Sequence, residues 1–241
     1  MSSNTKLELD TETSSSSFLG DLGPPIRSHQ QEEFEASEWL LFSNINKQVF
    51  SRDFLNSDDS ILQRCWNSYD SSQHLLLVKM TVSRAHETAA RVFEKHLFFC
   101  LIPMGLDDCL RTFGSATCEA ENGSAKQPDC QFLPRRLPRG RTAKWPSLVL
   151  SESNGDVQMV ITIKIGRGLP KIVLESWELV DDRAKRQQVI AIKKGRNNSV
   201  YVNGQPLVIR FDKLFLRSPT IRRETDISFH STMLNKIARD I

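Results

Sequence analysis

The chain has 241 residues, a length that fits one substantial domain with accessory segments. Hydrophobic residues make up 39% of the chain and charged residues 25%, values that fit a soluble globular protein. The net charge of +3 is too small to indicate a nucleic-acid partner, so the distribution of basic residues matters more than their total.

Targeting and metal-binding patterns are sparse. The five cysteines are odd in number and contain no Cys-x-x-Cys pair, so neither a structural zinc site nor a disulfide framework is predicted. No run approaches the ~18 apolar residues that span a bilayer. The opening stretch MSSNTKLELDTETSSSS has no apolar core of a signal peptide. We therefore expect an intracellular protein, nuclear or cytoplasmic, that is not secreted and has no membrane partner.

The chain is expected to divide into three parts. Residues 1–36 are rich in Ser, Thr, Asp and Glu and are predicted to be a disordered polar arm. Residues 37–81 form an N-terminal accessory segment, in which WLLFSNINKQVF predicts a short helix, DDSILQRCWNSY a helical turn and QHLLLVKM a strand. Residues 82–241 are expected to form the main domain.

The strongest helix signal lies at residues 82–102, where Ser83 is a candidate cap. At 100° per residue, apolar residues from position 89 to position 100 share one face together with His96. Glu87 lies on the opposite face, which is typical of a solvated position, and His86 lies at the border of the apolar stripe. Both histidines are expected to be buried and hydrogen-bonded rather than ligands, because nothing pairs them with a Cys or Ser nucleophile.

Strands follow this helix. Two short strand-like runs, LRTFGSATCEAE and KQPDCQFLPRR, flank the loop NGSAKQP. Residues 147–165 are predicted to form two strands, and in the second of these, isoleucines alternate with polar residues that include Lys164. A further strand is expected at 171–180, a basic polar loop at 181–198, and a final helix that Ser231 could cap. This order predicts the α+β fold class.

Several of these stretches together resemble fungal restriction-endonuclease-like proteins of the PD-(D/E)XK nuclease superfamily. The matching pieces span residues 82 to about 234 and are SRAHETAARVF, QPDCQFLPRR, WPSLVL, SNGDVQMVITIKI, KIVLESWEL and GQPLVIRFDKLFLR. The resemblance implies a nuclease-like core with a mixed central sheet and a leading helix. It also implies Mg²⁺-dependent hydrolysis of DNA, which needs hard oxygen ligands and a group that neutralises charge on the phosphate.

The resemblance also implies site residues. The superfamily places an Asp on one strand, a Glu on the next, a Lys nearby and often a further Glu on the first helix. Carried over, Asp129 is the first metal ligand, and the alternative is a turn residue that follows Pro128. Glu87 is the candidate helix acid. Lys164 is the candidate charge-stabilising lysine, or else a strand-end lysine that meets solvent.

The chain departs from the superfamily at the second ligand. A glutamate and a crossover helix should follow SLVL, but Ser151 stands there and the next strand begins almost at once, so the nuclease core is truncated between residues 150 and 156. The pair Asn154-Gly155 is a strong hairpin signal, and a hairpin makes its strands antiparallel. A parallel connection needs a dozen or more residues. The alternative is a frayed first strand, from which five residues merely reach across a gap.

Glu152 is the candidate substitute for the missing glutamate. It is displaced by one residue, which reverses the direction of a side chain in a strand, so it would point away from Asp129 unless a bulge corrects it. Glu152 is therefore either a substitute ligand or a solvated hairpin residue.

Basic residues gather in the stretch LPRRLPRGRTAKW, where a flexible loop beside the expected metal edge could grip a phosphate backbone. The candidate nucleic-acid-binding residues are Arg135, Arg136, Arg139, Arg141 and Lys144. Trp145 is either a base-stacking residue or a core anchor. A second basic run lies at 183–196, and a solvated loop is the alternative for both runs.

Three functions follow as hypotheses. The first is a degenerate nuclease-fold protein that retains DNA binding. The second is an active endonuclease with catalytic Asp129, Glu152 and Lys164, whose two carboxylates hold Mg²⁺. The third is an accessory or interaction protein unrelated to nucleic acid. The sequence favours the first, because a lone carboxylate binds Mg²⁺ too weakly. Magnesium is thus expected only if the protein is active, and otherwise no cofactor is expected.

Overall fold

A computed structural model of the chain describes residues 39–79, 84–120, 122–138, 157–166, 171–181, 183–195, 197 and 199–241. The chain divides into two units, which are considered separately. The first unit comprises the chain up to Thr81 and the excursion Glu119–Gln127, and the second comprises Val82–Cys118 and Pro128–Ile241. No helix of the described residues is long and apolar enough to cross a membrane.

The first unit is a small antiparallel sheet with short helices. Its strand order is β1-β3-β2-β6-β5. Its elements are β1 (Trp39–Phe42), α1 (Lys47–Phe50), the π-helix η1 (Ser51–Leu55), α2 (Ser60–Cys65), β2 (Trp66–Asp70), β3 (Leu75–Lys79), β5 (Cys118–Glu119) and β6 (Ala125–Lys126). The strand predicted in QHLLLVKM is confirmed as β3, and the helix predicted for WLLFSNINKQVF is confirmed only for its last four residues, which form α1. The first four residues of this stretch form β1 instead, which pairs with β3 through an antiparallel ladder.

Aromatic packing and side-chain caps define the local structure of the first unit. The Phe50 ring stacks on the Tyr69 ring at a centroid distance of 4.1 Å and meets the Trp66 ring edge-on at 5.0 Å. The Asn46 side chain accepts a hydrogen bond from the Val49 amide at 2.9 Å, which caps the start of α1. The three aromatic rings are at most 2% exposed and form the centre of this unit.

The second unit combines one long helix with an antiparallel sheet. Its elements are α3 (Arg84–Leu101), the 3-10 helices η2 (Ile102–Met104) and η3 (Asp107–Cys109), β4 (Leu110–Thr112), β7 (Phe132–Pro134), β8 (Val160–Ile165), β9 (Lys171–Val180), β10 (Arg183–Lys194), β11 (Val200–Asn203), β12 (Leu207–Ile209), α4 (Phe211–Phe215), β13 (Ile227–Phe229) and α5 (Ser231–Asp240). The helix predicted at 82–102 and the strand predicted at 171–180 are therefore confirmed, whereas Ser83 lies outside the described residues.

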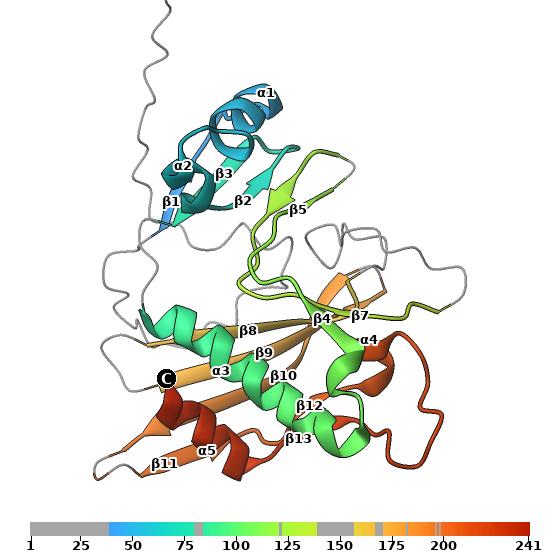
Figure 1. Ribbon diagram of the computed structural model, residues 1–241. Coiled ribbons are helices and arrows are strands. Elements are labelled where there is room, and N and C mark those ends of the chain that lie inside the picture. Colours follow the sequence, from blue (N-terminus) through green and yellow to red (C-terminus); the bar gives the residue numbers. More distant parts are fainter. Residues whose placement is uncertain are drawn as a thin grey trace, which may run out of the picture. The chain divides into compact units, whose positions relative to one another are not determined.

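The main sheet has the order β11-β10-β9-β8, and α3 and α5 cover one of its faces (Figure 1). Alternate residues of β9 and β10 supply the apolar floor, with Leu174 and Ile190 fully buried beneath the helices. The isoleucines Ile161 and Ile163 of β8 pack against the same core, as their alternation predicts. We refer to this side as the inner face of the sheet and to the other side as its outer face.

The α+β fold class is confirmed, but two details differ from the prediction. Each strand pair with a described register is antiparallel, so the expected mixed sheet is not seen in the described part of the chain. The predicted loop at 181–198 is wrong, because residues 183–194 form β10 and pair with β9 along most of its length. Asp181 opens the tight turn between them with a φ of +53°.

Two further expectations concern the final helix and the segment around Ser151. The final helix is confirmed as α5, but its cap position is His230 rather than Ser231, which is its first helical residue. The predicted strand at 147–150 and the Asn154-Gly155 hairpin lie outside the described residues.

Candidate functional site

Asp129, the predicted first metal ligand, lies just before β7 and faces the beginning of α3. Its side chain is 54% exposed, and its Oδ2 lies 3.1 Å from Nε2 of His86. His86 belongs to the first turn of α3, where the helix dipole also favours a nearby negative charge. The carboxylate of Asp129 is therefore in contact with the imidazole ring of His86 from α3.

A small cavity of about 70 Å³ surrounds this pair, and we call it the Asp129 cavity. Its lining residues come from α3, from the turn after β4 and from the segment before β7; they are His86, Glu87, Ala90, Arg91, Glu94, Gly114, Ser115, Asp129 and Cys130. Glu87 and Asp129 were predicted as site residues from separate parts of the sequence, and they line the same cavity. Glu87 is exposed at its rim, in agreement with its predicted place opposite the apolar stripe.

Cys130 is the one thiol that lines the Asp129 cavity. Burial raises the pKa of this thiol to about 11, and the nearby negative charge of Glu94 acts in the same direction. A cysteine reacts as a thiolate, and this thiol is protonated at neutral pH. Cys130 therefore contributes a protonated thiol to the cavity wall.

The carboxylates that line the Asp129 cavity belong to Glu87, Glu94 and Asp129. Mg²⁺ requires near-ideal octahedral oxygen coordination, and proteins hold it through carboxylates together with substrate phosphates. Here one carboxylate oxygen is in contact with an imidazole nitrogen. In the part of the chain that the structure describes, no group of three or more His, Cys, Asp or Glu side chains is placed to hold a metal ion. Glu152, the second predicted ligand, lies outside that part.

Lys164, the predicted catalytic lysine, makes a different set of contacts. Its Nζ lies 3.1 Å from Oε2 of Glu175 on β9, and Nη1 of Arg186 on β10 lies 3.0 Å from the other carboxylate oxygen. Thr162 completes the group with a hydroxyl donated to Glu175 at 3.3 Å. The burial of Glu175 acts to raise the pKa of its carboxyl, but the hydrogen bonds and charges of Lys164 and Arg186 outweigh burial and hold that pKa below its usual value. Lys164 thus neutralises a carboxylate of its own sheet.

The sheet register separates Lys164 from the Asp129 cavity. Lys164 is paired with Val173, and its neighbour Ile163 points into the core beneath α3. Successive side chains of a strand point to opposite faces, so Lys164 stands on the outer face of the sheet. His86 and Glu87 belong to α3, which covers the inner face. The structure therefore brings Asp129 and Glu87 together but leaves Lys164 on the other side of the sheet.

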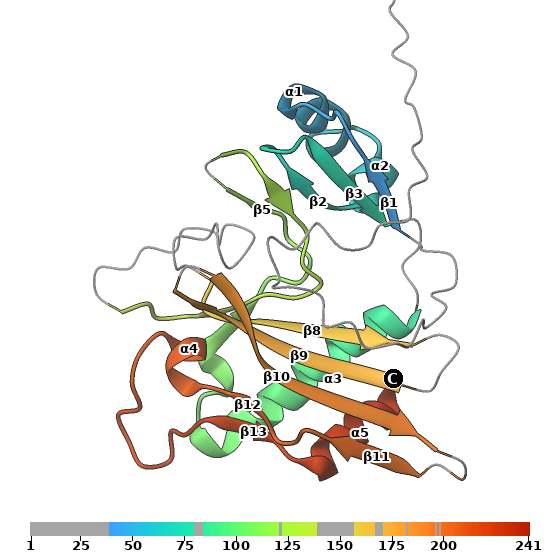
Figure 2. The ribbon, with the colours of Figure 1, turned by 180° about the vertical axis from the view of Figure 1, so that it is seen from behind.

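The outer face of the sheet is basic and aromatic. Figure 2 shows this face in front of the helices, and no described helix covers it. Its exposed members include Lys164 (66%), Arg186 (47%) and Tyr201 (67%), and Lys193 is exposed beside Tyr201 in the register of β10 and β11. Arg186 also lies over the ring of Trp177, 5.9 Å from its centroid. The basic residues at 183–194 thus contribute side chains to a sheet surface, not to a loop.

The predicted nucleic-acid-binding residues are described only in part. Arg135 and Arg136 directly follow β7 and are exposed, and Nε of Arg135 donates to the carbonyl of Leu110 at 3.4 Å. The remaining predicted residues, Arg139, Arg141, Lys144 and Trp145, lie outside the described residues.

Sequence reasoning did not identify the partners His86 and Glu175. The alternation in KIVLESWEL predicts that Glu175 lies on the same face as other non-core residues of its strand. The contact of Glu175 with Lys164, however, depends on the register between β8 and β9, which the sequence alone does not give. The contact of His86 with Asp129 joins two segments far apart in the chain and leaves no local pattern. Comparison with known proteins gives no match to a protein-family model, a curated protein or a solved structure.

Proposed function

We propose that this protein has a PD-(D/E)XK nuclease-like core whose catalytic site is degenerate, and that its retained activity is the binding of DNA. One observation carries the first part: Asp129 and Lys164 are each engaged by a partner of the chain and stand on opposite sides of the main sheet. This arrangement supports a loss of catalysis, because hydrolysis of a phosphodiester requires metal ligands and charge-stabilising groups that face the same phosphate.

The outer face of the sheet supports the second part of the proposal. Lysine and arginine side chains neutralise phosphates of a nucleic-acid backbone, and exposed aromatic rings such as that of Tyr201 stack on unpaired bases. Arg135 and Arg136 supply further exposed positive charge beyond β7. A single strand that lies across the sheet satisfies both kinds of contact, so single-stranded DNA is the form expected to bind best.

An active Mg²⁺-dependent endonuclease is the second candidate function, and a specific observation favours it. Asp129 and Glu87 line one cavity, and the superfamily places its strand acid and helix acid in this way. Glu152 is the residue that would add the second metal ligand in that case. The Mg²⁺ ion would then supply charge neutralisation and water activation at Asp129.

Binding and cleavage distinguish these functions when they are measured on the same protein. Full-length protein is titrated against labelled single-stranded and duplex DNA by fluorescence anisotropy over a series of salt concentrations. The proposal predicts binding that weakens steeply with salt, and further weakening in the double variant Arg135→Ala/Arg136→Ala. The matched control is Arg222→Ala/Arg239→Ala, which removes two exposed arginines from elsewhere on the same unit.

Each other outcome decides against the proposal. No binding at low salt identifies an accessory protein unrelated to nucleic acid. Cleavage of the DNA in Mg²⁺ or Mn²⁺ that is lost in Asp129→Ala identifies an active endonuclease. Equal weakening in the control variant identifies general charge attraction rather than a defined surface.

A further inference from the structure

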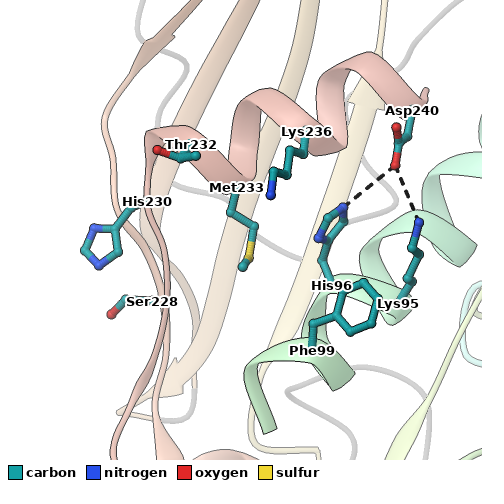
Figure 3. Close-up of a pocket in the computed structure, with 9 residues that line it drawn as sticks. All are labelled: Lys95, His96, Phe99, Ser228, His230, Thr232, Met233, Lys236 and Asp240. Atoms are coloured by element: carbon teal, nitrogen blue, oxygen red, sulfur yellow. Dashed lines mark ion pairs between the residues drawn. The ribbon is translucent and has the colours of Figure 1, made fainter. Parts of the chain in front are cut away.

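A second and larger cavity lies between α3 and α5. Its volume is about 650 Å³, within the range of small-molecule sites, and it shares no lining residue with the Asp129 cavity. Figure 3 shows its walls: Lys95, His96 and Phe99 of α3 on one side, and residues of β13 and α5 on the other. We call it the α3–α5 cleft.

One end of the α3–α5 cleft is rich in hydrogen-bond donors. Ser228, His230 and Thr232 line it at the point where α5 begins. The first N–H groups of a helix have no intrahelical acceptor and carry the positive end of the helix dipole. Lys236 follows Thr232 by four residues and so lies on the same side of α5. This end of the cleft therefore has several hydrogen-bond donors and one lysine, a combination that suits an anion with several oxygen atoms.

The middle of the α3–α5 cleft is apolar. Phe99 is a large apolar residue of α3 that is 51% exposed. Met233 lies opposite it, and its sulfur accepts a hydrogen bond from the Cys100 thiol at 3.6 Å. The His96 ring meets Phe99 edge-on, with a centroid distance of 6.0 Å and an interplanar angle of 77°. An aromatic ring and a thioether in this arrangement suit a flat apolar group.

The far end of the α3–α5 cleft holds a buried polar group. The His96 side chain is only 6% exposed, and its Nε2 has no hydrogen-bond partner among the described residues. The nearest carboxylate oxygen, Oδ2 of Asp240, is 3.9 Å away, beyond hydrogen-bonding distance. Lys95 Nζ lies 3.9 Å from the same oxygen. Burial lowers the pKa of His96, and its enclosed Nε2 faces the Asp240 carboxylate, so Asp240 and Lys95 are the charged groups at this end of the cleft.

We propose that the α3–α5 cleft binds an organic phosphate of the size of a nucleoside monophosphate. The phosphate lies at the N-terminal end of α5 near Thr232 and Lys236, the flat ring lies over Phe99, and a polar edge of the ring faces His96 and Asp240. The span fits such a ligand, because eight helical residues from Thr232 to Asp240 rise about 12 Å. The two lysines outnumber the single aspartate, so the lining carries a net positive charge that favours an anion.

The experiment is calorimetric titration of the full-length protein with AMP, supported by NMR of the histidine ring nitrogens. AMP is expected to bind saturably and to shift a ring-nitrogen signal that is absent in His96→Asn. Adenosine and inorganic phosphate are each expected to bind at least about tenfold more weakly, because each lacks one half of the ligand. A 5′-phosphorylated oligonucleotide, compared with its unphosphorylated form, distinguishes a strand end from a free nucleotide as the source of the phosphate.

Matched variants on the same two helices locate the site. Lys236→Ala is expected to weaken AMP binding about tenfold, whereas Arg239→Ala removes an exposed charge of α5 outside the cleft and leaves binding unchanged. Phe99→Ala is expected to weaken binding, whereas Ile102→Ala, at a residue that is 54% exposed and outside the cleft, does not. Circular dichroism verifies that each variant is folded.

Three results would overturn the inference: no saturable binding of AMP at millimolar concentration, equal loss in the paired control variants, or AMP binding that survives both Lys236→Ala and Phe99→Ala. DNA binding is measured on the same variants. A loss of AMP binding with DNA binding intact separates this cleft from the proposed function, whose residues are different.

Discussion

Nε2 of His86, in the first turn of α3, lies 3.1 Å from Oδ2 of Asp129, in the segment before β7. Asp129, the first metal ligand in the second candidate function, is thus in contact with α3. This contact joins the start of α3 to the segment before β7 and places an imidazole beside the Asp129 carboxylate.

Removal of this contact should cost little stability and restore no catalysis. We expect His86→Ala to lower the free energy of unfolding by less than about 1 kcal/mol, because the Asp129 side chain is half exposed and water screens the pair. Urea unfolding measures this change, and Arg91→Ala, which removes the ion pair of an exposed arginine with Glu94 on the same helix, is the control. Cleavage of DNA by His86→Ala in Mn²⁺ would show instead that the imidazole only masks a complete site.

The core beneath α3 and α5 distinguishes the two faces of the sheet. Ile190 is fully buried on the inner face of β10, whereas its neighbour Val189 is 41% exposed on the outer face. We expect Ile190→Ala to lower the free energy of unfolding by about 2–5 kcal/mol and Val189→Ala by less than about 1 kcal/mol. Similar losses in the two variants, measured by urea unfolding, would mean that the sheet register is wrong.

Some elements of this unit could be predicted from the sequence, and others depend on pairing with distant segments. The helix at 84–101 and the strands β8 and β9 follow from local periodicity, since apolar residues recur at the spacing that each element buries. The first half of β10 is a run of polar residues without alternation, and it is a strand only because β9 pairs with it. Likewise Asp129 and Glu87 could be named from the sequence, whereas the partners of Asp129 and Lys164 depend on long-range packing.

A second ion pair should give the stability of the protein a clear pH dependence. The hydrogen bonds from Arg217 lower the pKa of the Glu224 carboxyl to about 2, and Thr220 donates to the same carboxylate. In the folded state this group stays ionised at pH values where the unfolded chain takes up a proton. Its stabilising contribution is therefore complete above about pH 5 and is lost as the pH falls toward 2.

We therefore expect Glu224→Gln to be less stable than the wild type by about 1.5–3 kcal/mol at pH 7, with a difference that shrinks at acidic pH. Urea unfolding at a series of pH values between 7 and 3 measures it. Asp108→Asn, at an exposed carboxyl of the same unit, is the control and should show no such trend. A constant difference across this range would contradict the role given to Arg217.

The outer face of the sheet makes a prediction about aromatic stacking. We expect Tyr201→Ala to weaken the binding of single-stranded DNA by about 1–3 kcal/mol, because its exposed ring provides a stacking surface. Tyr201→Phe keeps the ring and should bind nearly as well as the wild type. Fluorescence anisotropy at constant salt measures both variants. If Tyr201→Ala binds DNA as well as the wild type, the outer face of the sheet is not part of the DNA-binding surface. Arg135 and Arg136 would then be the described residues that remain in it.

In the function that we propose, the protein binds DNA without cutting it. Electrophoresis of supercoiled plasmid after incubation with the full-length protein and Mg²⁺ or Mn²⁺ reads both properties from one gel, with Asp129→Ala beside the wild type. The claim predicts plasmid that is retarded by both proteins and intact after the protein is removed. Nicked or linear plasmid produced by the wild type and absent with Asp129→Ala would contradict it.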